Sequence, residues 1–133
     1  MRIPNHVLYS KKFLRGIRSV YKHDKHRLLL TELEYIQLTY DYIKNSDISM
    51  YHADQYGNVL GVVAGYSTRD IHYGDVFQCT INVVNPVVRG NISVGFTHLS
   101  TIYTCAYLCN CSQYLHVKHT SPTQRVITLR KIP

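Results

Sequence analysis

No carboxylate side chain follows Asp75, and the whole sequence has no tryptophan. All eight Asp and Glu residues lie at or before Asp75 in this chain of 133 residues. A general base after Asp75 must therefore be a histidine, a tyrosine, a thiolate or a water molecule.

Long apolar runs are also absent. No window approaches eighteen uninterrupted apolar residues, so we expect no membrane-spanning helix. The first residues, Met1 to His6, lack the apolar core of a secretory signal. These absences and the length predict a cytoplasmic protein of a single domain, residues 1–133.

Cysteines are absent before residue 79, and four follow: Cys79, Cys105, Cys109 and Cys111. The spacing of the last three is not a zinc-finger pattern, and no second cysteine pair follows. We interpret them as reduced, partly buried thiols and predict no metal site. The alternative is a metal site that combines Cys109 and Cys111 with His116 and His119.

Positive charge is concentrated near the N-terminus. The net charge is +7, and eight of the fifteen basic residues precede Leu28: Arg2, Lys11, Lys12, Arg15, Arg18, Lys22, Lys25 and Arg27. Only Asp24 opposes them there. This segment predicts a polyanionic partner, namely a nucleic acid, an acidic protein or a phosphorylated cofactor. The alternative is a solvated helix face that aids solubility.

Periodicity predicts two helices before residue 48. Residues 5–22 are compatible with a helix. Thr31 and Glu34 have the spacing of a capping box that begins the second helix. The apolar side chains of the second helix fall on one helical face: Leu33, Ile36, Tyr40 and Ile43. Residues 45–47 end it.

The period then changes to that of strands. We expect strands at 48–53 and 59–66, joined by a hairpin turn, and a loop at 68–75. The apolar segment Val76 to Val84 predicts a central strand. Two further strands, 113–118 and 125–132, are expected around a turn at 121–123.

A long helix is expected between the central strand and these last strands, with Asn91 as its N-cap and its end near Cys109. Its predicted buried stripe is Ile92, Phe96, Leu99, Ile102 or Tyr103, and Ala106. The order of elements predicts an α+β domain on a mostly antiparallel sheet, with two N-terminal helices and one long helix after the central strand.

The connection between the central strand and the long helix has a distinctive composition. Asn85-Pro86 ends the strand, and a loop, Val87 to Asn91, contains Arg89 and Gly90. The first N–H groups of a helix have no partner within the helix, and the helix dipole is positive there. This turn is therefore suited to bind an anion; the alternative is a simple connection.

This order of elements, with this turn, resembles the Gcn5-related N-acetyltransferase (GNAT) superfamily over nearly the whole chain. Val84-Asn85-Pro86 matches the Val-x-Pro that ends the family's central strand. The segment Arg89 to Val94 occupies the place of Arg/Gln-x-x-Gly-x-Gly/Ala, and Phe96 and Leu99 supply hydrophobic positions of the helix. The closing segment, 114–132, looks like the final strands of short phage-encoded acetyltransferase-like proteins.

The resemblance implies a GNAT-like fold that binds acetyl-CoA where the central strand splays from its neighbour at a bulge. Val83 and Val84 would pair with the pantetheine amides. The residues implied for the pyrophosphate are Arg89, Gly90, Asn91, Ile92, Ser93 and Val94. The sequence departs from the family pattern, because Ile92 and Val94 stand where the family has glycines.

The leading hypothesis is therefore an acetyl-CoA-dependent N-acetyltransferase acting on an amine. No catalytic residue is assigned, since the family's carboxylate and tyrosine acid have no counterpart. The histidine bases available after Asp75 are His98, His116 and His119, and Tyr103 and Tyr107 are the candidate acids. Each of these five residues also has an ordinary alternative, as a surface, hydrogen-bonded or packing side chain.

Two other classes stay open. One is a catalytically silent GNAT-like binding module, such as a phage-encoded inhibitor of a host protein in the host cytoplasm. The other is a small basic nucleic-acid-binding protein that uses Arg2 to Arg27. A cluster of tyrosines is compatible with a protein or nucleotide interface, or with packing on a small sheet: Tyr51, Tyr56, Tyr66 and Tyr73.

Overall fold

The computed structural model describes all residues, Met1–Pro133, and its strands form one five-stranded sheet in the order β1-β2-β3-β4-β5. The strands are β1 (Ile48–Ala53), β2 (Val59–Asp70), β3 (Gly74–Val84), β4 (Gln113–Ser121) and β5 (Gln124–Lys131). Only the β3–β4 pair is parallel; the other three neighbouring pairs are antiparallel. The predicted α+β fold on a mostly antiparallel sheet is confirmed.

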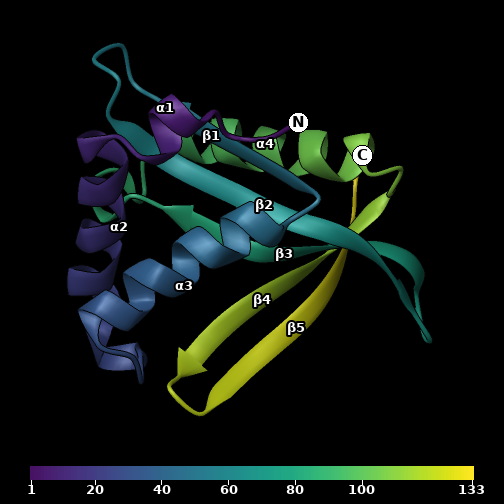
Figure 1. The fold of residues 1–133 in the computed structure, drawn as a ribbon. Helices are drawn as coiled ribbons and strands as arrows, with labels where there is room; N and C mark the ends of the chain where they lie inside the picture. The colour runs from purple at the N-terminus through teal and green to yellow at the C-terminus, as the bar shows by residue number, and fades with distance from the viewer.

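Helices cover both faces of the sheet. They are α1 (Asn5–Leu8), α2 (Lys11–Asp24), α3 (Glu32–Asn45) and α4 (Ile92–Leu108), with short 3-10 turns η1 (Lys25–Arg27) and η2 (Pro86–Val88). Figure 1 shows α1, α2 and α3 on one side of the sheet and α4 on the other. Helix α4 is the crossover that two parallel neighbouring strands need, and it connects β3 to β4.

Side-chain caps fix where the helices begin. Ser10 accepts a hydrogen bond from the Phe13 N–H and begins α2, which divides the predicted first helix in two. The predicted capping box at the start of α3 is present, with Thr31 and Glu34 satisfying each other's backbone N–H groups. Asn91 accepts from the Val94 N–H at the start of α4, as predicted.

Two hydrophobic clusters hold the layers together. The cluster under α2 and α3 contains Ile3, Leu8, Phe13, Ile17, Ile43, Val59, Val62 and Ala64. The cluster under α4 contains Ile48, Val63, Phe77, Ile102, Cys105, Ala106, Cys111 and Tyr114.

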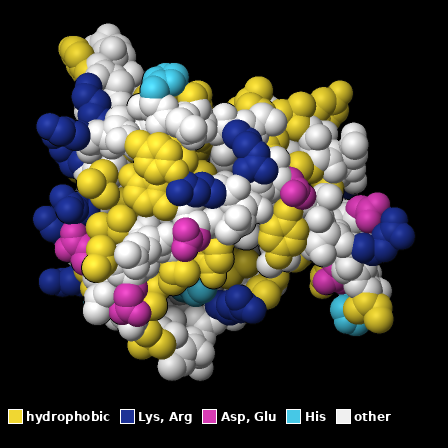
Figure 2. Space-filling view, in the orientation of Figure 1, with side chains coloured by type: hydrophobic (Ala, Val, Ile, Leu, Met, Phe, Trp, Pro, Cys, Tyr) yellow, Lys and Arg dark blue, Asp and Glu magenta, His cyan; other side chains and the backbone are white.

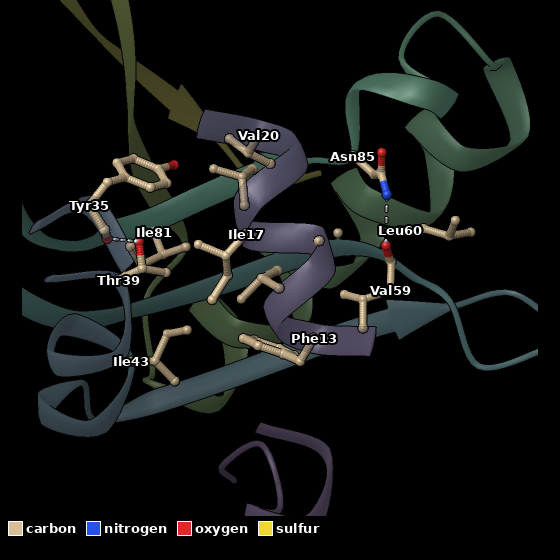
Figure 3. A pocket seen from close by; sticks show the side chains of 14 residues that line it. Phe13, Ile17, Val20, Tyr35, Thr39, Ile43, Val59, Leu60, Ile81 and Asn85 are labelled. Carbon is tan, nitrogen blue, oxygen red and sulfur yellow. Dashed lines mark hydrogen bonds between the residues drawn. The ribbon is translucent and has the colours of Figure 1, made fainter. Parts of the chain in front are cut away.

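A cavity of about 30 Å³ remains between α2, α3 and the sheet (Figure 3). Ligand pockets are typically about 300 Å³ or more, so this cavity is a packing defect and not a substrate site.

The predicted loop at residues 68–75 is wrong. Strands β2 and β3 continue through it and leave only Ile71, His72 and Tyr73 as a turn. The Asp70 carboxylate accepts hydrogen bonds from the N–H groups of His72 and Tyr73. An ion pair between Arg69 and Asp75, at 3.0 Å, joins the two strands beside the turn. The polar side chains of this segment, which suggested a loop, stabilise the turn of an exposed hairpin.

The predicted buried stripe of α4 is wrong at its first two positions. Ile92 and Phe96 are 77% and 70% exposed, and the buried residues are His98, Thr101, Ile102, Cys105 and Ala106. Helix α4 has no Asp, Glu, Lys or Arg, and its polar residues are mostly small Ser and Thr, so its pattern specifies only weakly which face packs. Leu33, on the apolar face of α3, is 65% exposed. No helix of the protein combines the length and apolar character needed to cross a bilayer.

Candidate functional site

Strands β3 and β4 pair over a very short distance. The register joins only Phe77 to Tyr114 and Gln78 to Leu115. Both strands then continue for six further residues, to Val84 and Ser121, without pairing with each other. Figure 1 shows the β4–β5 hairpin diverging from β3 beyond this point. The sheet therefore opens in its middle, along the edge of β3 that leads to α4.

A β-bulge lies where the strands separate. Ala64 of β2 pairs with Ile81, but its neighbour Gly65 pairs with Cys79, so Thr80 is the extra residue of β3. The Thr80 hydroxyl donates to the Ala64 carbonyl at 3.2 Å. A bulge bends its strand and increases the local twist. The bend begins two residues after Gln78, the last residue of β3 that pairs with β4.

The opened segment of β3 presents backbone groups on the side that β4 has left. The Asn85 N–H donates to the Leu60 carbonyl at 2.8 Å, which sets the alternation of this antiparallel ladder. The backbone N–H and C=O of Val83 are consequently directed toward β2. The backbone N–H and C=O groups of Asn82 and Val84 are directed toward the opening. The Val84 carbonyl accepts the Arg89 Nε–H at 3.0 Å. The cofactor roles of Val83 and Val84 remain predictions.

The β3–α4 turn, residues 85–91, ends at an open helix N-terminus. Asn85 caps the Val87 N–H, and Asn91 caps the Val94 N–H at 3.0 Å. The N–H groups of Ile92 and Ser93 make no hydrogen bond within the chain. Gly90 has φ 86°, a left-handed conformation that favours glycine. The turn thus leaves donors at the positive end of a 17-residue helix.

Arg89 does not extend freely from this turn. Its guanidinium forms two parallel hydrogen bonds with the Asp24 carboxylate, each 3.0 Å long. Asp24, at the end of α2, also accepts from Arg27 at 2.9 Å and bonds His23 at 2.8 Å. Burial alone would raise the pKa of Asp24, but hydrogen bonds from Arg89, His23 and Arg27 outweigh it and hold this pKa well below its usual range. Arg89 therefore fastens the turn to α2, with its charge compensated by Asp24.

A hydrogen-bonded chain of three side chains lies beneath α4. His52 of β1 and His98 of α4 are joined Nε2 to Nδ1 at 2.9 Å, and the His98 Nε2 lies 2.7 Å from the Asn82 Oδ1 of β3. Because an amide oxygen only accepts, His98 donates through Nε2. In the neutral form of His98, its Nδ1 accepts from the His52 Nε2–H.

The surroundings of this pair favour the neutral form. Burial, with a smaller contribution from His52, lowers the pKa of His98 to about 4. Burial also lowers the pKa of His52. Gly61 makes room for both rings, because a Cβ there would lie 2.2 Å from His52 Nε2 and 2.6 Å from His98 Nδ1. His98, one of the three predicted bases, is therefore a buried member of this network.

The other candidate acids and bases lie apart from that network. His116 is half-buried on β4, immediately after Leu115, where the sheet opens; burial, Arg130 and Lys118 lower its pKa. His119 is exposed three residues further along β4. Tyr103 packs against Tyr114, with ring centroids 6.1 Å apart, and Tyr107 is 77% exposed. Of the predicted bases, His116 lies nearest the opening in sequence, and its catalytic role stays a prediction.

The cysteines are free thiols, as predicted, either buried or half-buried. Burial raises the pKa of Cys79 and of Cys105 to about 12, so neither thiol is a ready nucleophile at neutral pH. The structure brings together no group of three or more His, Cys, Asp or Glu side chains that could hold a metal ion.

The sequence interpretation missed His52, Asn82 and Asp24 as parts of the site. Their contacts join residues 46, 16 and 65 positions apart, so no local spacing indicates them. The one available signal was compositional: Asp24 is the only acidic residue among the N-terminal basic residues.

Comparison with known proteins yields a structural match. No family model matches the sequence, and no curated protein sequence matches it. Among solved structures, Chaetomium thermophilum Naa20 in complex with a bisubstrate analogue is similar, with a TM-score of 0.51 and 12% identity. The match covers 90% of this chain and 83% of the Naa20 chain. Naa20 is an N-acetyltransferase with the GNAT fold, and at this identity the likeness concerns the fold alone. The predicted resemblance to phage-encoded proteins stays a prediction. The chain has a GNAT-like fold.

Proposed function

We propose that the protein is an acetyl-CoA-dependent N-acetyltransferase. The observation that carries the proposal is the opening between β3 and β4, which begins at the Thr80 bulge and ends at the open N-terminus of α4. An unpaired strand edge beside an anion-binding helix end suits a ligand with amides at one end and phosphates at the other. The solved structure of Naa20, with the same type of fold, holds a bisubstrate analogue.

In this proposal each part of the opening has its own task. The backbone of β3 at Val84, next to Val83, pairs with the pantetheine amides of acetyl-CoA. Within the segment Arg89 to Val94, the free N–H groups of Ile92 and Ser93 hold the pyrophosphate, while the Arg89 side chain keeps the turn in place through Asp24.

The reaction needs orientation more than covalent chemistry by the protein. The acceptor amine attacks the thioester carbonyl, the carbon–sulfur bond breaks, and CoA leaves as the thiol. The amine proton passes to a base, which we propose to be His116 or water, since no carboxylate occurs after Asp75. Holding the amine and the thioester together supplies most of the acceleration.

Cofactor binding is measured first, by thermal and urea unfolding with and without acetyl-CoA. Acetyl-CoA at a hundred times its dissociation constant should add about 2.7 kcal/mol to the free energy of unfolding. An unchanged melting temperature at millimolar acetyl-CoA would contradict the proposal. Binding without release of thiol in the presence of amine acceptors would instead support the catalytically silent module.

Ser93→Asp is expected to weaken acetyl-CoA binding at least tenfold while leaving the fold intact. Ser93 is exposed in the first turn of α4, where a carboxylate favours the helix by roughly 0.3–1 kcal/mol. The same carboxylate would repel a pyrophosphate and compete for the free N–H groups. Ser100→Asp is the matched control, because Ser100 is exposed on the same helix two turns later. Calorimetric titration that finds equal affinities for both variants would place the phosphates elsewhere.

A further inference from the structure

Helix α2 has one face made of cations. Lys11, Arg15, Arg18 and Lys22 are exposed and follow one another at intervals of four, three and four residues, which aligns them along the helix. The buried residues of α2, Phe13, Ile17 and Val20, lie on the opposite side. At 1.5 Å per residue, the line of cations is roughly 16 Å long.

This line forms one wall of an open groove of about 1040 Å³, and η2 forms the other. The groove, called the basic groove below, is lined by Lys11, Leu14, Arg15, Arg18, Ser19, Lys22, His23, Pro86 and Val87. No acidic residue lines it. Figure 2 shows the Lys and Arg side chains gathered on the left edge of the molecule, over α2.

The charge of the basic groove is almost uncompensated. Lys11, Arg15 and Lys22 form no ion pair with the chain. Arg18 approaches Glu32 at 3.4 Å, but the two side chains are 54% and 39% exposed, and ion pairs in contact with solvent are weak. Asp24, the acidic residue at the end of α2, is already paired with Arg27 and Arg89. The groove therefore carries about four positive charges that a ligand can neutralise.

We propose that the basic groove binds the sugar–phosphate backbone of a nucleic acid. Regularly spaced charges of one sign complement a ligand with regularly spaced charges of the other sign, and a phosphodiester chain has this property. Phe, Tyr and Trp side chains, on which unpaired bases stack, are absent from the lining. Contacts to phosphates position a nucleic acid without reading its sequence, so we expect binding that is independent of sequence.

This proposal does not rest on the acetyltransferase proposal. The basic groove uses side chains of α2, whereas the proposed cofactor site uses the backbone of β3 and the start of α4. The two sites are adjacent through η2, which immediately precedes the turn. Acetyl-CoA is consequently included as a competitor, and the Ser93→Asp variant should keep full affinity for nucleic acid.

Fluorescence anisotropy with a labelled DNA duplex, in 50 to 200 mM salt, tests the proposal. Four phosphate contacts predict that the logarithm of the association constant falls against the logarithm of salt concentration with a slope of about −3.6. This slope corresponds to a loss of affinity of about a hundredfold across the range. A single RNA strand of equal length should show a slope of about −2.8. Flat salt dependence would overturn the proposal.

The double variant Arg15→Gln, Lys22→Gln should reduce the duplex slope by about 1.8, since two contacts are lost. The double variant Arg125→Gln, Lys131→Gln is the matched control, because it removes the same charge from exposed positions of β5. Melting curves check that both variants fold. Equal losses in the two variants would show net-charge attraction only and would overturn the groove as the site. Equal affinity for polyglutamate would instead indicate an acidic protein, and displacement by acetyl-CoA would assign the groove to the cofactor's phosphates.

Discussion

Gly65→Ala is expected to lower the free energy of unfolding by about 3 kcal/mol, at the upper end for overpacking substitutions. A Cβ at Gly65 would lie 2.2 Å from the backbone carbonyl oxygen of Gln78 and 2.9 Å from the Phe77 ring. The carbonyl belongs to the sheet backbone beside the bulge, so it cannot move aside as a side-chain tip would. Relief requires β2 and β3 to separate where β3 turns away from β4.

Urea unfolding measures this effect, with Gly95→Ala as the matched control. Gly95 is exposed on α4, and a Cβ there would meet nothing within 4 Å. The control should gain up to about 1 kcal/mol, because alanine favours a helix interior over glycine. A Gly65→Ala protein as stable as the control would show that the bulge does not depend on close backbone approach. If the variant stays folded, weaker acetyl-CoA binding would link the bulge to the opening.

Elements with local chemical signals were predictable from the sequence. Thr31 and Glu34 specify a capping box three residues apart, and Asn91 caps α4 from the adjacent position. The central strand and the turn after it were placed correctly, because Asn85-Pro86 ends an apolar segment there. In each case the physical cause is a backbone donor satisfied by a neighbour in the chain.

The faces of helices were less predictable. Helix α4 presents Ile92 and Phe96 to solvent and buries His98 and Thr101, the reverse of a hydrophobicity pattern. The buried polar groups are satisfied, since His98 bonds His52 and Asn82, and Thr101 bonds the Thr97 carbonyl. Burial of a polar group depends on partners distant in sequence, and no periodicity contains that information.

Part of the candidate site was predictable from the sequence and part was not. The β3–α4 turn is a local feature, and the sequence indicated it. The engagement of Arg89 by Asp24 depends on how α2 packs against η2, so the free charge that the sequence suggested is compensated in the structure. The proposed site therefore relies on backbone N–H groups for its anion affinity. Ile92 and Val94, which stand where the family has glycines, still have these backbone N–H groups.

Acidification from pH 6.5 to pH 4 is expected to lower the free energy of unfolding by about 3 kcal/mol through His98 alone. His98 has a pKa of about 4 in the folded chain and 6.5 as its ordinary value. Between these values the unfolded chain binds a proton that the folded chain excludes, so stability rises with pH. The contribution is fully present above pH 6.5 and is lost as the pH falls through 4. His52 and His116, whose pKa values burial also lowers, act in the same direction.

Urea unfolding at several pH values tests this, with His98→Gln compared with His72→Gln as the control for loss of an exposed histidine. The quantity compared is the change in stability with pH, since His98→Gln also disturbs hydrogen bonds to His52 and Asn82. The His98 variant should lose most of the dependence between pH 6.5 and 4, and the control should keep it. The lowered pKa of Asp24 acts only below its ordinary value of 3.8, so its loss falls outside this window. An unchanged slope in the His98 variant would show that His98 keeps its ordinary pKa in the folded chain and would contradict the prediction.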